Sequence, residues 1–334
     1  MTLWRPVPVL DTAPLPGALP LAGGPLRFDR VEVLERGRAP QVVPPSEVPG
    51  TVLDRLTAPR PPFAALSLDR PRIMGIVNVT PDSFSDGGRF LDPAAAAAQG
   101  RRLAAAGAEL LDIGGESTRP GAAEVPEAEE TARILPVIAA LRDGPPISVD
   151  TRKAGVARAA LASGAAAVND VTALTHDAAM ASVVAQAGVP VVLMHMRGTP
   201  ETMQDDPRYD DVVQDVYAWL ADRIVAAEAA GIPRSAIAVD PGIGFGKTGD
   251  HNLALIRRLS VFHGLGCAVM LGASRKRFVG TIGGADRPED RMPGSVAVAL
   301  AGAAQGAQIL RVHDVAETRQ ALALWRAIWT GGTA

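Results

Sequence analysis

Eight short apolar runs, each followed by an amphipathic stretch, constrain the fold of this chain more than any other feature. The runs are rich in Val, Ile and Leu and lie at 72–79, 108–115, 146–151, 165–171, 189–196, 236–242, 267–274 and 307–315. The amphipathic stretches lie at 92–106, 127–142, 153–163, 177–187, 209–230, 251–263, 293–305 and 315–329. Continuously apolar strands that alternate with helices are typical of a parallel sheet buried on both faces.

A TIM (β/α)8 barrel accounts best for eight near-regular units of this kind. Such barrels take about 250 residues, and the units here fill residues 71–334. Glycines that suit a helix C-cap follow several of the expected helices, for example Gly107 and Gly188. A doubly wound open sheet is the alternative, but the regular repetition favours closure into a barrel.

Residues 1–70 differ from the rest of the chain. They contain many prolines and no long apolar period. The segment 26–37 alternates between apolar and polar residues, which predicts a strand or hairpin. We expect the remainder to be an extended or irregular N-terminal extension that packs on the barrel; a separate functional module is the alternative.

Composition excludes several classes of partner. The net charge is −3, whereas a nucleic-acid-binding domain is expected to be basic. No apolar run approaches the ~20 residues that span a bilayer, and the N-terminus lacks the pattern of a secretory signal. The single cysteine, Cys267, excludes an internal disulfide and a cysteine metal site. We therefore expect a cytoplasmic protein without nucleic-acid or membrane partners.

Polar residues end all eight apolar runs. They are Asn78, Asp112, Glu116, Asp150, Asn169, Asp170, His195, Asp240, Ser274, Arg311 and His313. The carboxyl ends of the strands of a barrel converge on one mouth, where active sites lie. A polar cluster at every strand end is hard to explain by packing, so the sequence predicts a functional site there.

The types of residue at these ends indicate what they bind. The two oxygens of Asp240, held by the turn Pro241–Gly242, match two parallel N–H donors on a guanidine-like edge. The amide of Asn169 can accept and donate, as reading a heterocycle requires. Arg311 and His313 point to the same side of their strand and, with Asn78 on the adjoining strand, form a candidate anion pocket.

The loops and the expected metal site give less specific indications of function. The length of the connection 78–90 is typical of a mobile lid or a solvated linker. Thr118 and Arg119, on the next connection, could bind an oxyanion. A hard cation such as Mg²⁺, held by Asn78 and by the phosphates of a ligand, fits better than a tight protein-only metal site. The glycine-rich segment after Asp240 lacks the full spacing of a nucleotide phosphate loop.

Stretches from all eight strand ends resemble, in order and spacing, the motifs of the dihydropteroate synthase family. They are MGIVNVTPDSFSDGG, LDIGGESTRPGA, SVDTRK, VND, LMHMRGTP, VDPGIGFGK, GASRK and RVHDV. The resemblance covers about residues 72–330, and no motif is broken. It also contains the only three lysines, Lys153, Lys247 and Lys276. It does not cover residues 1–70.

The resemblance implies a homodimeric TIM-barrel transferase of folate biosynthesis and a target of sulfonamides. Its substrates would be 6-hydroxymethyl-7,8-dihydropterin pyrophosphate and p-aminobenzoate, with Mg²⁺ bound at Asn78. The implied pterin residues are Asp150, Asn169, Asp240 and Lys276; those for pyrophosphate are Asn78, Thr118, Arg311 and His313; those for p-aminobenzoate are Phe84, Thr118, Arg119, Pro120 and Ser274. Catalysis would rest on Asp150, Lys276, Arg311 and His313.

Three alternatives remain to be weighed. A pterin-dependent methyltransferase shares the barrel but has no need of the RVHD segment or the NVTPDSF loop. A non-catalytic pterin-binding paralogue would tolerate loss of Asn78, Arg311 or His313, and all three are present. An aldolase barrel would need a Schiff-base lysine inside the barrel. Lys276 instead follows a strand end, and Lys153 and Lys247 lie outside the strands.

Overall fold

The computed structural model describes residues 1–11, 16–80, 93–119, 121–199 and 201–331. Eight parallel strands close into a barrel, each paired with its sequence neighbour and the last with the first. They are β5 (Arg72–Asn78), β6 (Leu110–Gly114), β7 (Ile147–Asp150), β8 (Ala167–Asp170), β9 (Val191–Met194), β10 (Ile237–Asp240), β11 (Ala268–Leu271) and β12 (Ile309–Val312). Each lies within one of the eight apolar runs, so the predicted TIM barrel is confirmed.

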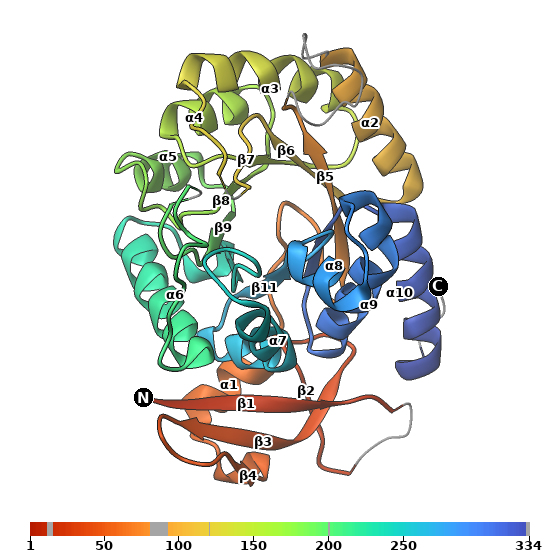
Figure 1. The fold of residues 1–334 in the computed structure, drawn as a ribbon. Helices are drawn as coiled ribbons and strands as arrows, with labels where there is room; N and C mark the ends of the chain where they lie inside the picture. The colour runs from red at the N-terminus through yellow and green to blue at the C-terminus, as the bar shows by residue number, and fades with distance from the viewer. Residues whose placement is uncertain (12–15, 81–92, 120, 200, 332–334) are drawn as a thin grey trace.

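A ring of helices surrounds the strands (Figure 1). The expected helices are α2 (Pro93–Ala106), α3 (Glu127–Leu141), α4 (Ala154–Ala162), α5 (Met180–Ala187), α6 (Val212–Ala229), α7 (Gly249–Arg257), α9 (Met292–Ala304) and α10 (Val315–Trp329). The sequence analysis missed α8 (Arg277–Gly283), a short helix directly after β11. The stretch expected at 251–263 is divided into α7 and the 3-10 helix η4 (Leu259–Leu265), which lies before β11.

Side chains inside the barrel form an apolar layer with a polar layer above it. The apolar layer belongs to one cluster that includes Leu110, Ala167, Ala238 and Ile309. Alternate residues of a strand face the same side. The residues two positions further along these strands are therefore also directed inward, and they are Asp112, Asn169, Asp240 and Arg311. Because alternate residues of each strand face inward, the polar layer lies directly above the apolar layer, which forms the floor of the site.

The chain that leads into β5 closes the lower end of the barrel. Phe63 and Leu68 are each 3% exposed and pack into the same apolar cluster. Phe63 and Leu66 exchange backbone hydrogen bonds of 2.9 Å, which hold this segment in a tight turn. This segment thereby closes the barrel interior at its lower end.

The N-terminal extension is more ordered than the sequence analysis expected. The strand expected within 26–37 is β3 (Arg27–Glu35), the centre of an antiparallel sheet with β1 (Thr2–Val9), β2 (Leu19–Pro20) and β4 (Gln41–Val43). The helix α1 (Gly50–Thr57) follows. The expectation of otherwise irregular chain is wrong, because β1 pairs on one side only. An edge strand can hold prolines, which cannot donate a hydrogen bond.

This sheet packs beside the barrel, below α7 in the view of Figure 1. Ser260 of η4 donates a hydrogen bond of 2.7 Å to the backbone oxygen of Pro6 in β1. Arg60 is 8% exposed and donates to the backbone oxygens of His263 at 3.0 Å and Cys267 at 2.9 Å. The extension and the barrel therefore share one continuous core. In the part of the chain that the structure describes, no helix is long and apolar enough to cross a bilayer.

Candidate active site

Arg311 lies at the centre of a group of ion pairs at the mouth of the barrel. Its Nε donates to Oδ2 of Asp112 at 2.6 Å, and its Nη2 donates to Oδ2 of Asp150 at 2.6 Å. Asn169 donates through Nδ2 to the same Asp112 oxygen at 3.0 Å. These contacts join side chains from β6, β7, β8 and β12. The sequence analysis assigned no role to Asp112, which is fully buried.

Burial controls the charge of Asp150. Loss of water raises the pKa of this carboxyl, Arg311 lowers it, and the nearby acids Asp112, Glu130 and Asp170 raise it, to about 7. Burial also acts on Arg311, but the acids beside it raise the pKa of its guanidinium. Asp150 can therefore change charge near neutral pH, while Arg311 stays cationic.

Two buried oxygens in this group lack a hydrogen-bond partner within the described residues. They are Oδ1 of Asp112 and Oδ1 of Asn169. An unsatisfied buried polar group costs about 1–3 kcal/mol. Acceptors left free at the mouth of a barrel therefore suit a ligand that brings N–H donors.

Asp240 offers a further acceptor. Its Oδ1 accepts the backbone N–H of Gly242 at 2.7 Å. Its Oδ2 lies beside Gly272, where an added Cβ would stand 3.2 Å away. Burial raises the pKa of Asp240, against the opposing effect of Lys276 and the hydrogen bond from Gly242. Oδ1 of Asp240 thus fixes the turn after β10, and Oδ2 lies beside the backbone of Gly272, which has no side chain.

Lys276 interacts electrostatically with Asp240. Its Nζ donates to the backbone oxygen of Ile243 and stands 4.1 Å from the centre of the Phe245 ring. Burial lowers the pKa of Lys276 to about 7, although Asp240 opposes the shift. The ammonium is thus held against the loop that follows β10.

His313 is hydrogen-bonded to Ser274. Its Nδ1 lies 3.0 Å from Oγ of Ser274, and its backbone N–H donates to the same oxygen at 3.2 Å. Burial, followed by the positive charges of Arg311, Arg275, Arg119 and Lys276, lowers the pKa of His313 to about 3. The ring is therefore neutral at physiological pH and offers a hydrogen bond rather than a charge.

The remaining predicted residues lie on the rim. Thr118 is half-buried and Arg119 is exposed on the connection after β6. Asn78 ends β5 beside Gly114 of β6, and within the described residues no hydrogen bond joins it to Arg311 or His313. The expected anion pocket is therefore not closed by direct contacts. Phe84 and Pro120 lie outside the described residues.

His195 does not face the mouth as the sequence analysis expected. Strand alternation turns Met194 inward and His195 outward, where its ring packs 4.9 Å from that of Trp219. Its Nδ1 lies 2.9 Å from Nζ of Lys247, which also donates to the backbone oxygen of Phe245 at 2.9 Å. Burial lowers the pKa of His195 to about 2. This pair supports the loop after β10 from behind.

The site offers few ligands for a metal ion. Within the described residues, no group of three or more His, Cys, Asp or Glu side chains could hold one. The Asn78 amide can contribute one oxygen, which fits a hard cation that takes most of its ligands from a bound phosphate. The residues present thus fit Mg²⁺ only together with an oxygen-rich substrate.

Comparison with known proteins agrees with this geometry. The family model described as pterin binding enzyme matches residues 74–313. The chain belongs to the pterin-binding enzyme family. The match spans β5 to the end of β12 and includes every predicted site residue, and it leaves the N-terminal extension outside.

Two members of this family with solved structures and one curated relative are dihydropteroate synthases. The enzyme of Escherichia coli (strain K12) is 45% identical over 260 residues, which is 77% of this chain and 92% of that protein. The Xanthomonas albilineans enzyme with 4-aminobenzoic acid is 52% identical, with a TM-score of 0.76 over 81% of this chain and 98% of that one.

The third is the Yersinia pestis enzyme with a sulfonamide drug complex. It is 46% identical, with a TM-score of 0.75 over 78% of this chain and 95% of that one. The resemblance inferred from the strand-end motifs is therefore confirmed.

Proposed function

We propose that this enzyme condenses 6-hydroxymethyl-7,8-dihydropterin pyrophosphate with p-aminobenzoate to give 7,8-dihydropteroate and pyrophosphate. The observation that carries the proposal is the set of buried acceptor oxygens of Asp112, Asn169 and Asp240 above the apolar floor. A pterin has an aminopyrimidinone edge of adjacent N–H donors that these oxygens can accept. The named relatives favour this reaction over a methyltransferase or a non-catalytic pterin-binding protein.

The reaction needs charge stabilisation rather than a strong base. The C–O bond to pyrophosphate breaks with its electron pair moving to the leaving oxygen, and the reduced pterin spreads the resulting positive charge. The ionised carboxylate of Asp150 stabilises that cation. Arg311, held by Asp112 and Asp150, supplies a fixed positive charge for the departing anion, which lowers the barrier without reorganisation. The arylamine nitrogen then bonds to the carbon and loses a proton.

Mg²⁺ is proposed as the cofactor. When bound, it supplies positive charge to the pyrophosphate oxygens. The protein contributes the Asn78 amide at the end of β5, hydrogen-bond donors from Thr118 and His313, and the guanidinium of Arg311. The neutral state of His313 assigns it to donating a hydrogen bond to the leaving group.

The p-aminobenzoate pocket is proposed on the rim, above the pterin. Thr118, Arg119 and Ser274 would line it, together with Phe84 and Pro120. A sulfonamide would compete for the same space; the Yersinia pestis enzyme has been solved with a sulfonamide drug complex. The homodimer expected from the resemblance stays a prediction; the exposed Leu324 and Ile328 on α10 are a candidate surface for it. The cytoplasmic location also stays a prediction.

The deciding experiment measures release of pyrophosphate from the pterin pyrophosphate with and without p-aminobenzoate and Mg²⁺. We expect release that depends on both, with 7,8-dihydropteroate as the product. No product under these conditions would exclude the synthase reaction.

Two variants separate the roles within the site. Asp240→Ala should lower the affinity for the pterin by more than about tenfold, because it removes a charged hydrogen-bond acceptor. Arg311→Ala should act mainly on kcat, because Arg311 acts on the developing charge. Asp222→Asn, on the exposed face of α6, is the control. Calorimetry showing unchanged pterin affinity in Asp240→Ala would contradict the assignment of Asp240.

A further inference from the structure

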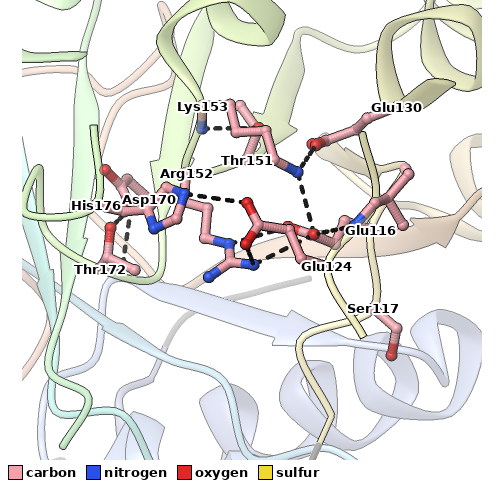
Figure 2. Close-up of polar contacts among 12 residues, drawn as sticks. Glu116, Ser117, Glu124, Glu130, Thr151, Arg152, Lys153, Asp170, Thr172 and His176 are labelled. Carbon is pink, nitrogen blue, oxygen red and sulfur yellow. Dashed lines mark hydrogen bonds and ion pairs between the residues drawn. The ribbon is translucent and has the colours of Figure 1, made fainter. Parts of the chain in front are cut away.

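Glu116, two residues after β6, has a carboxylate that is nearly saturated with partners. Its Oε2 accepts from Nε of Arg152 at 3.0 Å. Its Oε1 lies 3.1 Å from Nζ of Lys153 and accepts the backbone N–H of Val125 at 2.7 Å. The side chain is only 4% exposed. Figure 2 shows this carboxylate between the two cations.

Both cations lie on the connection that follows β7, the strand that ends at Asp150. Arg152 and Lys153 follow the end of β7 at two and three residues from that aspartate. Lys153 also binds Oε2 of the fully buried Glu130 on α3 at 2.6 Å. Lys153 thus forms ion pairs with both Glu116 and Glu130. This end of β7 is therefore held rigidly from α3.

Glu116 also joins the two ends of one loop. Glu116 begins the segment 116–125, and Val125, whose N–H it accepts, ends it. Glu124 adds a contact of 3.6 Å to Arg152. At the start of the loop, Gly115 is pressed against α3, where an added Cβ would lie 2.8 Å from Ile134. The segment is thus closed at its base by one carboxylate.

We propose that Glu116 is a positioning residue for p-aminobenzoate. Its carboxylate clamps both ends of the loop 116–125 to the end of β7, and so fixes Thr118 and Arg119 relative to Asp150. The inference rests on the proposed function of these loop residues. It explains why four buried charges gather where no substrate contact is expected, since buried ion pairs with several partners hold a unique arrangement.

A purely structural role of Glu116 predicts a different result. If these ion pairs only held α3 and β7 together, their loss would lower the thermal stability and weaken both substrates alike. A clamp on the loop acts mainly on p-aminobenzoate, because Asn169 and Asp240, which bind the pterin ring, lie on β8 and β10, away from the loop. The split between the two substrates is therefore the informative readout.

The test uses two variants of the full-length enzyme. Glu116→Gln removes the charge. Glu116→Asp keeps the charge near Arg152 and Lys153 but is one methylene too short to reach the Val125 amide as well. Glu228→Gln is the matched control, because Glu228 also binds an arginine, Arg234, with both oxygens, at 2.9 and 2.7 Å, outside the site.

We expect both Glu116 variants to raise the KM for p-aminobenzoate about tenfold or more, as small displacements of positioning groups do. Calorimetry with 6-hydroxymethyl-7,8-dihydropterin should give an affinity within about twofold of the wild type, because Asp240 and Asn169 are untouched. Hydrogen exchange of the Val125 amide should accelerate in both variants and not in the control.

The clamp is overturned if the wild-type enzyme is active and Glu116→Asp has the same KM for p-aminobenzoate as the wild type. A loss of pterin affinity in step with the rise in KM would overturn it equally. If Glu116→Gln fails to fold, Glu116→Asp decides alone. A wild-type enzyme that makes no product refutes the proposed function itself, which is a separate outcome.

Discussion

Asp112 and Asp150 share one guanidinium, and this arrangement governs how the site responds to pH. Arg311 contacts both acids at 2.6 Å. It lowers the pKa of Asp150 and also that of Lys276, and both lie at about 7. The productive state has Asp150 ionised and Lys276 protonated. Those two requirements oppose one another as pH changes.

We expect kcat/KM to follow a bell-shaped curve with its maximum near pH 7. Ionisation of Asp150 produces the acid limb, and loss of the proton from Lys276 produces the alkaline limb. Arg311→Met removes a positive charge that lowers both pKa values, so both limbs should move to higher pH. Initial rates measured between about pH 5 and pH 9 check this. Limbs that stay in place in the variant would exclude Arg311 as the cause.

Strand ends alone were enough to predict Asp150, Asn169, Asp240 and Arg311 as neighbours. Asn169, Asp240 and Arg311 each follow an apolar residue at a spacing of two, Asp150 follows Ser148 at that spacing, and the barrel brings the four positions together. Glu116 was also among the strand-end residues, but its partners could not be predicted, because Arg152 lies 36 residues further along the chain. Contacts between a loop and the next strand end leave no period in the sequence.

The turn after β10 shows how an element fixes the position of a side chain. Gly242 has a φ of 69°, and a Cβ added there would lie 1.8 Å from the backbone oxygen of His195. Its N–H is also the donor that holds Asp240. The strand end and the turn are thus one unit, which the DPG sequence alone already indicated.

Gly242→Ala should therefore lower the free energy of unfolding by more than about 3 kcal/mol, from the positive φ and the backbone clash together. It should also weaken the pterin, because the turn that orients Asp240 has to move. Gly284→Ala is the control: its φ is 67°, with nothing within 4 Å of the added Cβ. Urea unfolding of both variants measures the difference, and equal losses would show that the contact with His195 carries no weight.

At the scale of the whole molecule, the extension does two separate things. The sheet of β1 to β4 covers η4 from outside, while residues 58–70 run on to close the floor of the barrel. The proline content of β1 hid the sheet from sequence analysis, since prolines argue against a central strand but not against an edge. The floor was hidden because Phe63 and Leu68 belong to no periodic segment.

The two parts can be separated by truncation. Deleting residues 1–43 should give a folded, active enzyme with a lower melting temperature, because η4 and α1 lose their cover while the floor residues stay in place. Deleting residues 1–70 should give insoluble protein, since loss of Phe63 alone removes a buried aromatic worth about 3–5 kcal/mol. Circular dichroism and the pyrophosphate assay distinguish these outcomes. A soluble, active enzyme without residues 1–70 would contradict the role of the floor.

A barrel with a sealed floor is a well with one opening. If the pterin binds against Asp240 and Asn169 and p-aminobenzoate binds on the rim loops, as proposed, the pterin has to enter first. We therefore expect ordered binding of the two substrates. A molecule that occupies the rim alone should block entry of the pterin as well as the reaction.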